Sequence, residues 1–161
     1  MTLLQENAAT SGFDDLGKLL FGGVAAAIHG SVRGTSDVDF VYSRSTANLA
    51  RLVSALSAAH PYLRGAPAGL PFRWDVETIR RGLNFTLVTD VGDIDLLGEI
   101  VGGGTYEELK DQCIRVQVFG LECLCLDLEP LIRVKRAAGR PKDLEAIAEL
   151  EKLLELKRRR S

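Results

Sequence analysis

The stretch LFGGVAAAIHGSVRGTSDVDF, residues 20–40, sets the expectations for the fold of this chain. Its first two residues continue an apolar run that begins at Leu19 and ends at Phe21, and this run predicts a buried strand. Gly22 and Gly23 then predict a tight turn, and the alanine-rich residues 24–29 predict a short helix. Glycine lets a ligand approach the backbone, and a helix start offers unpaired N–H groups, so the pattern favours phosphate binding. An ordinary tight turn would also explain it.

Asp37 and Asp39 lie in the segment DVDFVY, residues 37–42, whose polar and apolar residues alternate as in a half-buried strand. Residues two apart point to the same face of a strand, with Cα atoms about 6.6 Å apart. Two carboxylates this close repel each other unless a cation lies between them. Carboxylates together with substrate phosphates suit Mg²⁺. The pair predicts a metal site, with an acidic strand edge facing water as the alternative.

The chain after residue 42 predicts further helices and hairpins. Leu49, Leu52, Val53 and Leu56 have helical spacing within residues 46–59, residues 61–71 read as a loop, and residues 75–81 as one or two helical turns. Two hairpins are expected: one pairs residues 84–89 with 94–97, and the other pairs residues 114–119 with 121–126 around Gly120. Between them, Thr105 and Glu108 predict a capping box.

The last part of the chain predicts two helices. The first is capped by Asp127 and ended by Gly139, and the second is opened by Pro141 and runs toward Lys157. We therefore expect an α+β fold: a mixed β-sheet with flanking helices and a helical C-terminal section. Residues 1–161 would form a single domain, with its core at about residues 18–126 and its C-terminal helices at about residues 127–158.

Composition excludes several classes of protein. The 161 residues are 46% hydrophobic and 26% charged, as in globular domains, and a net charge of -2 does not suit a general polyanion binder. No apolar run approaches the roughly 20 residues of a membrane span, and Met1–Gly17 lacks the pattern of a secretory signal. We expect a cytoplasmic protein without membrane contact. The three cysteines argue against a disulfide framework and predict buried structural thiols.

Together these segments resemble a known family. The strand, the glycine pair, the short helix, His29-Gly30 and the run Arg33-x-Thr35-x-Asp37-Val-Asp39 resemble the nucleotidyltransferases of the DNA polymerase beta superfamily. The likeness is to small bacterial members grouped with AbiEii-type toxins and antibiotic nucleotidyltransferases. GDIDLLG at residues 92–98 resembles the strand that bears their third carboxylate. The C-terminal helical motif is matched by Leu131-Ile132-x-x-Lys135 followed by GRPKD at residues 139–143, so the resemblance spans residues 18 to about 150.

The resemblance implies a transfer of a nucleoside monophosphate from a nucleoside triphosphate to an acceptor, with release of pyrophosphate. It implies two Mg²⁺ ions, replaceable by Mn²⁺, held by the catalytic residues Asp37, Asp39 and Asp95. Asp95 is preferred to Asp93 as the third carboxylate because Asp93 falls at the expected turn, where aspartate is common for turn chemistry alone.

Nucleotide contacts would come from Gly22, Gly23, Arg33 and Lys135, although surface roles would also explain Arg33 and Lys135. Many members of the superfamily have serine in place of the second glycine, so here backbone amides would bind more of the phosphate. Arg140, Lys142 and Asp143 either pair with one another or face the site. His29 is expected to be structural.

The acceptor stays open between a small molecule such as an antibiotic, an RNA 3′ end and a protein hydroxyl. The sequence lacks the aromatic-rich basic stripes that stack single-stranded bases, which mildly disfavours RNA. The alternative to an enzyme is a catalytically silent nucleotide-binding module, for example a toxin–antitoxin partner with a cognate antitoxin. The presence of all three carboxylates favours the enzyme.

Overall fold

A computed structural model describes residues 16–118 and 121–161 of the chain. Within these residues the chain forms a mixed seven-stranded sheet with helices packed against it, which confirms the expected α+β class. The expectation about a secretory signal in residues 1–15 and the turn expected around Gly120 lie outside the described residues.

The main sheet has the strand order β3-β4-β5-β2-β1-β9-β8. Strand β2 is parallel to β5 and β1 is parallel to β9, while the other neighbours are antiparallel. The strands are β1 (Lys18–Phe21), β2 (Asp37–Tyr42), β3 (Tyr62–Leu63), β4 (Asn84–Thr89), β5 (Gly92–Leu97), β8 (Cys113–Val118) and β9 (Leu121–Leu126). A second, two-stranded ladder is formed by β6 (Glu99–Ile100) and β7 (Gly104–Thr105).

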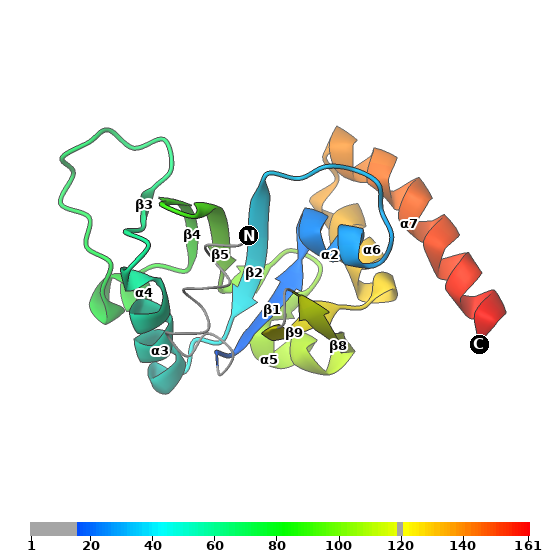
Figure 1. Ribbon diagram of the computed structural model, residues 1–161, viewed down its shortest axis with the longest axis horizontal. Helices are drawn as coiled ribbons and strands as arrows, with labels where there is room; N and C mark the ends of the chain where they lie inside the picture. The colour runs from blue at the N-terminus through cyan, green and yellow to red at the C-terminus, as the bar shows by residue number, and fades with distance from the viewer. Residues whose placement is uncertain (1–15, 119–120) are drawn as a thin grey trace.

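The helices gather in two groups (Figure 1). One group consists of α3 (Thr46–Ser57) and α4 (Val76–Arg81), which pack against each other. In the other, α2 packs against β1, β2 and α6, and α6 packs against α7; these helices are α2 (Gly22–Ile28), α6 (Leu128–Ala138) and α7 (Pro141–Arg160). The short helix α5 (Tyr106–Leu109) continues into a 3₁₀ turn at Lys110–Gln112.

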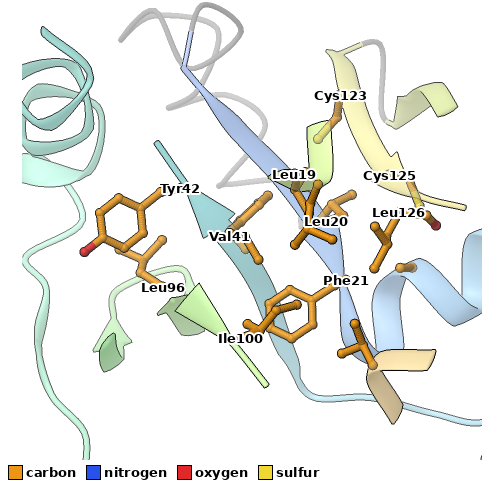
Figure 2. Packing of buried hydrophobic residues seen from close by; sticks show 14 of the residues in the cluster. Leu19, Leu20, Phe21, Val41, Tyr42, Leu96, Ile100, Cys123, Cys125 and Leu126 are labelled. Atoms are coloured by element: carbon orange, nitrogen blue, oxygen red, sulfur yellow. Dashed lines mark hydrogen bonds between the residues drawn. The ribbon is translucent and has the colours of Figure 1, made fainter. Parts of the chain in front are cut away.

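Strand β1 lies in the middle of the hydrophobic core, and every one of its side chains is buried. Leu19 and Leu20 point to opposite faces of the sheet, so both faces are covered. Figure 2 shows them among buried side chains from β2 and β9, including Val41 and Leu126, both of which are 0% exposed. Since β1 pairs with β2, this buried strand fixes the position of the DVDFVY segment.

The C-terminal helices begin and end close to where the sequence places them. The Asp127 side chain accepts a hydrogen bond from the backbone N–H of Leu128 and caps α6. Gly139 ends α6 in the left-handed conformation, with φ of 66°, as glycine does at helix C-termini. Pro141 occupies the first turn of α7, where its missing N–H costs little.

Four details differ from the sequence-based expectations. Helix α2 begins at Gly22, so the glycine pair forms the first residues of a helix instead of a turn. The Thr105 side chain makes no capping hydrogen bond, so the capping box is wrong. Residues 61–71 contain the edge strand β3. Asp93 lies inside β5, because the turn before that strand consists of Asp90 and Val91 alone.

The thiols are mostly inside the fold. Cys123 and Cys125 are buried, as expected, whereas Cys113 is only partly buried. Burial raises the pKa of the Cys113 thiol, and that of Cys125, to about 12, so both are protonated and poorly nucleophilic at neutral pH. Among the described residues, no helix combines the length and apolarity needed to cross a membrane.

Candidate metal centre and its cleft

Asp37, Asp39 and Asp95 converge at one place in the fold. Each offers a carboxylate oxygen, and these three oxygens lie within 4.8 Å of one another. All three side chains are partly buried, so each stays accessible to a small ligand. Three converging carboxylates form a hard, oxygen-only donor set of the kind that binds divalent cations. The triad can therefore hold a metal ion.

Strand register creates this convergence. Asp37 and Asp39 are two residues apart on β2 and point to one face of the sheet. Strand β5 runs parallel to β2, and Asp95 is the direct register partner of Asp39. Asp93 is the partner of Asp37, but it does not belong to the group of converging carboxylates. Of the two aspartates on β5, it is therefore Asp95 whose carboxylate lies with those of Asp37 and Asp39.

Asp39 is the most strongly perturbed member of the triad. Burial raises the pKa of Asp39, and a hydrogen bond to Asp95 with the charges of Asp95 and Asp37 raises it further, to about 7; Lys135 opposes the shift. The shift has the sign expected for a buried carboxyl group beside two other carboxylates. A divalent cation between these carboxylates would remove its cause.

The two glycines make room for the triad. A Cβ at Gly22 would lie 2.1 Å from Asp39 Oδ2, and the backbone there has φ of +69°, so both space and conformation require glycine. A Cβ at Gly23 would lie 2.7 Å from Oγ1 of Thr35, so even serine would collide with Thr35 there. The Thr35 hydroxyl donates in turn to the backbone carbonyl of Asp37 at 3.2 Å.

A cleft of about 370 Å³ opens beside the triad. Such a volume lies within the range typical of small-molecule sites. Its polar lining consists of Asp39 and Asp95, of Asn84 and Glu99, and of three residues at the corner between α6 and α7. Its apolar wall comes mainly from α6 and from β6 with the residue after it. The lining consists of Phe21, Gly22, Asp39, Asn84, Asp95, Leu97, Glu99, Ile100, Val101, Leu131, Val134, Lys135, Ala137, Ala138, Arg140 and Asp143.

Two of the three charged residues of the GRPKD segment, residues 139–143, face the cleft. Arg140 and Asp143 line it, while Lys142 is exposed and does not. Lys135 lines it as well, with a side chain that is only 13% exposed. Cations and carboxylates therefore face one shared space.

Arg33 lies elsewhere. Its guanidinium contacts Glu145 at 3.6 Å and Glu149 at 3.7 Å, both on α7, and it does not line the cleft. His29 contacts the backbone carbonyl of Leu126 through Nε2 at 2.9 Å, in line with a structural role. Of the seven residues predicted for the site, Arg33 alone lies away from it, paired with α7. The other six form the triad, line the cleft or lie next to it: Gly22, Gly23, Asp37, Asp39, Asp95 and Lys135.

Arg64 belongs to the site but was missed in the sequence. Its Nη2 donates to Asp95 Oδ1 at 2.7 Å and to the carbonyl of Leu87 at 3.0 Å, and its Nε lies 3.3 Å from Asp93 Oδ2. Arg64 thus holds Asp95 from the side of β4 and neutralises part of the negative charge. No local motif marks this arginine, which lies 31 residues before Asp95.

No protein-family model matches the chain, and no curated protein matches it in sequence.

Proposed function

We propose that this protein is a metal-dependent nucleotidyltransferase, which moves a nucleoside monophosphate from a nucleoside triphosphate to an acceptor. The observation that carries the proposal is the convergence of Asp37, Asp39 and Asp95 at a cleft that also contains Lys135 and Arg140. Metal-binding carboxylates and phosphate-binding cations are the two elements that this chemistry needs. The resemblance of residues 18 to about 150 to the DNA polymerase beta superfamily supports the same function.

The triad suits Mg²⁺, with Mn²⁺ as a substitute. Asp37 and Asp39 would share the ions, and Asp95 would bind on the acceptor side. When bound, the metal would neutralise negative charge on the phosphate oxygens. Gly22 supports this arrangement because its missing side chain leaves Asp39 the space that it occupies.

The transfer is a substitution at the α-phosphorus. An acceptor hydroxyl forms a bond to this phosphorus, and the bond from the phosphorus to the pyrophosphate oxygen breaks. Pyrophosphate takes the electron pair and leaves, and the hydroxyl proton passes to Asp95. Lys135 offsets negative charge on the phosphates as a point charge, and Arg64 keeps Asp95 in place.

A pair of isosteric variants tests the proposal. Asp95→Asn keeps the shape of the side chain but removes a charge of the triad, so Mg²⁺-dependent pyrophosphate release should fall by about 100-fold or more. Asp93→Asn is the matched control: Asp93 lies two residues from Asp95 on β5 and outside the triad, and asparagine keeps a side-chain oxygen for the contact with Arg64, so its rate should stay near that of the wild type. The assay uses each of the four ribonucleoside triphosphates with cell extract as the source of acceptor.

Two outcomes would contradict the proposal. If both variants released pyrophosphate at the wild-type rate, the triad would not be the catalytic centre. If the wild-type protein bound nucleoside triphosphate but released no pyrophosphate with any nucleotide, the protein would instead be a nucleotide-binding module on the same fold.

A further inference from the structure

Strand β4 has one buried face and one face in solvent. Its residues alternate: Phe85 and Leu87 are 8% and 0% exposed, whereas Asn84, Thr86 and Val88 are exposed, Val88 at 42%. Such alternation marks a sheet with one face packed on the core and the other solvated. The three exposed side chains form what we call the open face of β4.

The open face lies directly beside the triad. Thr86 is the register partner of Asp95, which in turn pairs with Asp39 on β2. Residues in register point to the same face of a sheet, so the open face continues the surface that carries the three carboxylates. Val88 pairs in the same way with Asp93. Because β5 lies between β4 and β2, Asp95 is the carboxylate of the triad that borders the open face.

The cleft leaves most of the open face uncovered. It reaches this face at Asn84 and does not extend over Thr86 or Val88. Its volume of about 370 Å³ is near the lower end of the range for small-molecule sites, about 300–1,000 Å³. In the proposed reaction the nucleoside triphosphate takes this space. An acceptor that reaches Asp95 would therefore approach over the open face of β4.

The charges of this surface do not suit a nucleic acid. Strands β3, β4 and β5 contain no lysine or arginine, and their charged residues are Asp93 and Asp95. Arg64, directly after β3, is already engaged by both aspartates, at 2.7 Å from Asp95 and 3.3 Å from Asp93. Binding of a nucleic acid depends on cations that neutralise its phosphates. The surface around Asp95 therefore favours an acceptor without a polyanionic backbone.

The side chains of the open face suit contact with a protein. Asparagine and threonine offer neutral donors and acceptors beside the apolar valine, and Tyr62, the partly exposed register partner of Val88, adds an aromatic ring. Low charge and tyrosine are typical of the centre of a protein–protein interface. A small molecule, by contrast, is usually bound in a concave site that buries most of its surface.

We propose that the open face of β4 docks a protein acceptor, which presents a serine, threonine or tyrosine hydroxyl to Asp95. This inference rests on the proposed function and names the class of its acceptor. The side-chain oxygen forms a bond to the α-phosphorus, and the bond from that phosphorus to the pyrophosphate oxygen breaks. Pyrophosphate leaves with the electron pair, and the hydroxyl proton passes to Asp95. The acceptor then carries a nucleoside monophosphate as a phosphodiester.

The first test identifies what becomes labelled. The protein is incubated with Mg²⁺, cell extract and each ribonucleoside triphosphate labelled with ³²P at the α-phosphate. We expect label in material that proteinase K degrades and ribonuclease does not, and mass spectrometry should locate a nucleoside monophosphate on a hydroxyl side chain. Label in RNA or in a small molecule would overturn the protein acceptor and leave the transferase intact. Absence of label from every fraction would contradict the transferase itself.

A matched pair of variants tests the docking face. Val88→Gln removes an apolar contact without adding a charge beside Asp93, so labelling of protein should fall about fivefold or more. Leu156→Gln is the control, because Leu156 is 43% exposed on α7 and does not line the cleft. That variant should label protein as the wild type does.

Calorimetric titration with the donor nucleotide and Mg²⁺ separates docking of the acceptor from binding of the nucleotide. Both variants should bind the nucleotide with wild-type affinity. Wild-type labelling of protein by Val88→Gln would overturn the docking face. A loss of nucleotide affinity in Val88→Gln that accounts for its loss of labelling would overturn it as well, because β4 would then contact the donor.

Discussion

At the scale of single residues, Asp39 is the carboxylate of the triad whose ionisation the fold disfavours most. The pKa of its carboxyl group is raised from 3.8 to about 7 by burial and by its neighbouring carboxylates. The folded protein therefore holds a proton that the unfolded chain releases between these two values. In this pH range only the folded state binds the proton. The free energy of unfolding therefore decreases as the pH rises from about 4 to about 7.

Asp39→Asn should remove this dependence. In the presence of EDTA, the variant should be more stable than the wild type at pH 8 by roughly 1 kcal/mol, or about 2–4 °C in Tm, and its stability should change less between pH 4 and pH 7. Added Mg²⁺ should raise the Tm of the wild type but not that of the variant, because only the wild type keeps the full triad. Equal Mg²⁺ stabilisation of both proteins would contradict the metal site.

Gly22 offers a second test at this scale. Gly22→Ala should lose Mg²⁺-dependent stabilisation and about 1–3 kcal/mol of folding stability, because the new Cβ meets Asp39 and φ is +69°. Gly69→Ala is the control: its φ is +91°, but no atom lies within 4 Å of the added Cβ, so it carries the backbone strain alone. Thermal melts with EDTA and with Mg²⁺ compare them. Retention of the Mg²⁺ effect in Gly22→Ala would show that the glycine does not serve the triad.

At the scale of elements, the sequence predicts those strands and helices well whose apolar residues recur with a regular local period. The alternation in DVDFVY predicts β2 and the shared face of Asp37 and Asp39, and both agree with the structure. Asp95 stands within an apolar run, and the structure makes it the register partner of Asp39. Strand period does not separate Asp95 from Asp93, which share a face, and the reason given for preferring Asp95, that Asp93 falls at a turn, is wrong because Asp93 lies inside β5.

Elements that depend on tertiary pairing escaped the sequence. Strand β3 is two residues long in a stretch rich in proline and glycine, and it is a strand only because it pairs with β4. Arg64 follows β3 directly, so without β3 nothing brings it to Asp95. Gly22 reads as a turn because glycine favours helices poorly, and the reason for it, the contact with Asp39, is not visible along the chain.

The loop between α2 and β2 is held by α7. Its Arg33 forms ion pairs with Glu145 and Glu149, and the backbone N–H of Val32 donates to Glu149 at 3.2 Å. Arg33→Ala should therefore change the affinity for nucleoside triphosphate less than twofold and cost at most about 1 kcal/mol of stability, as exposed ion pairs do. Calorimetric titration and a thermal melt measure both. A tenfold loss of nucleotide affinity would return Arg33 to the nucleotide-binding residues.

At the scale of the whole molecule, the cleft is assembled from parts far apart in the sequence. The sheet supplies Asp39 and Asp95, and the C-terminal helices supply Lys135, Arg140 and Asp143. The helical section is therefore part of the site and not an appendage to it. The sequence proposed Asp39, Asp95 and Lys135 for the site and left Arg140 and Asp143 open. All five line one cleft because α6 packs on α2 and on α7.

The most direct test of the central claim follows the position of a label in the nucleotide. The protein is incubated with Mg²⁺, cell extract and each ribonucleoside triphosphate labelled with ³²P at the α- or the γ-phosphate. Nucleotidyl transfer predicts that α-label enters an acceptor, that γ-label leaves as pyrophosphate, and that both events disappear with EDTA and with Asp95→Asn. Transfer of the γ-label to an acceptor, or transfer of α-label that survives in Asp95→Asn, would contradict the account.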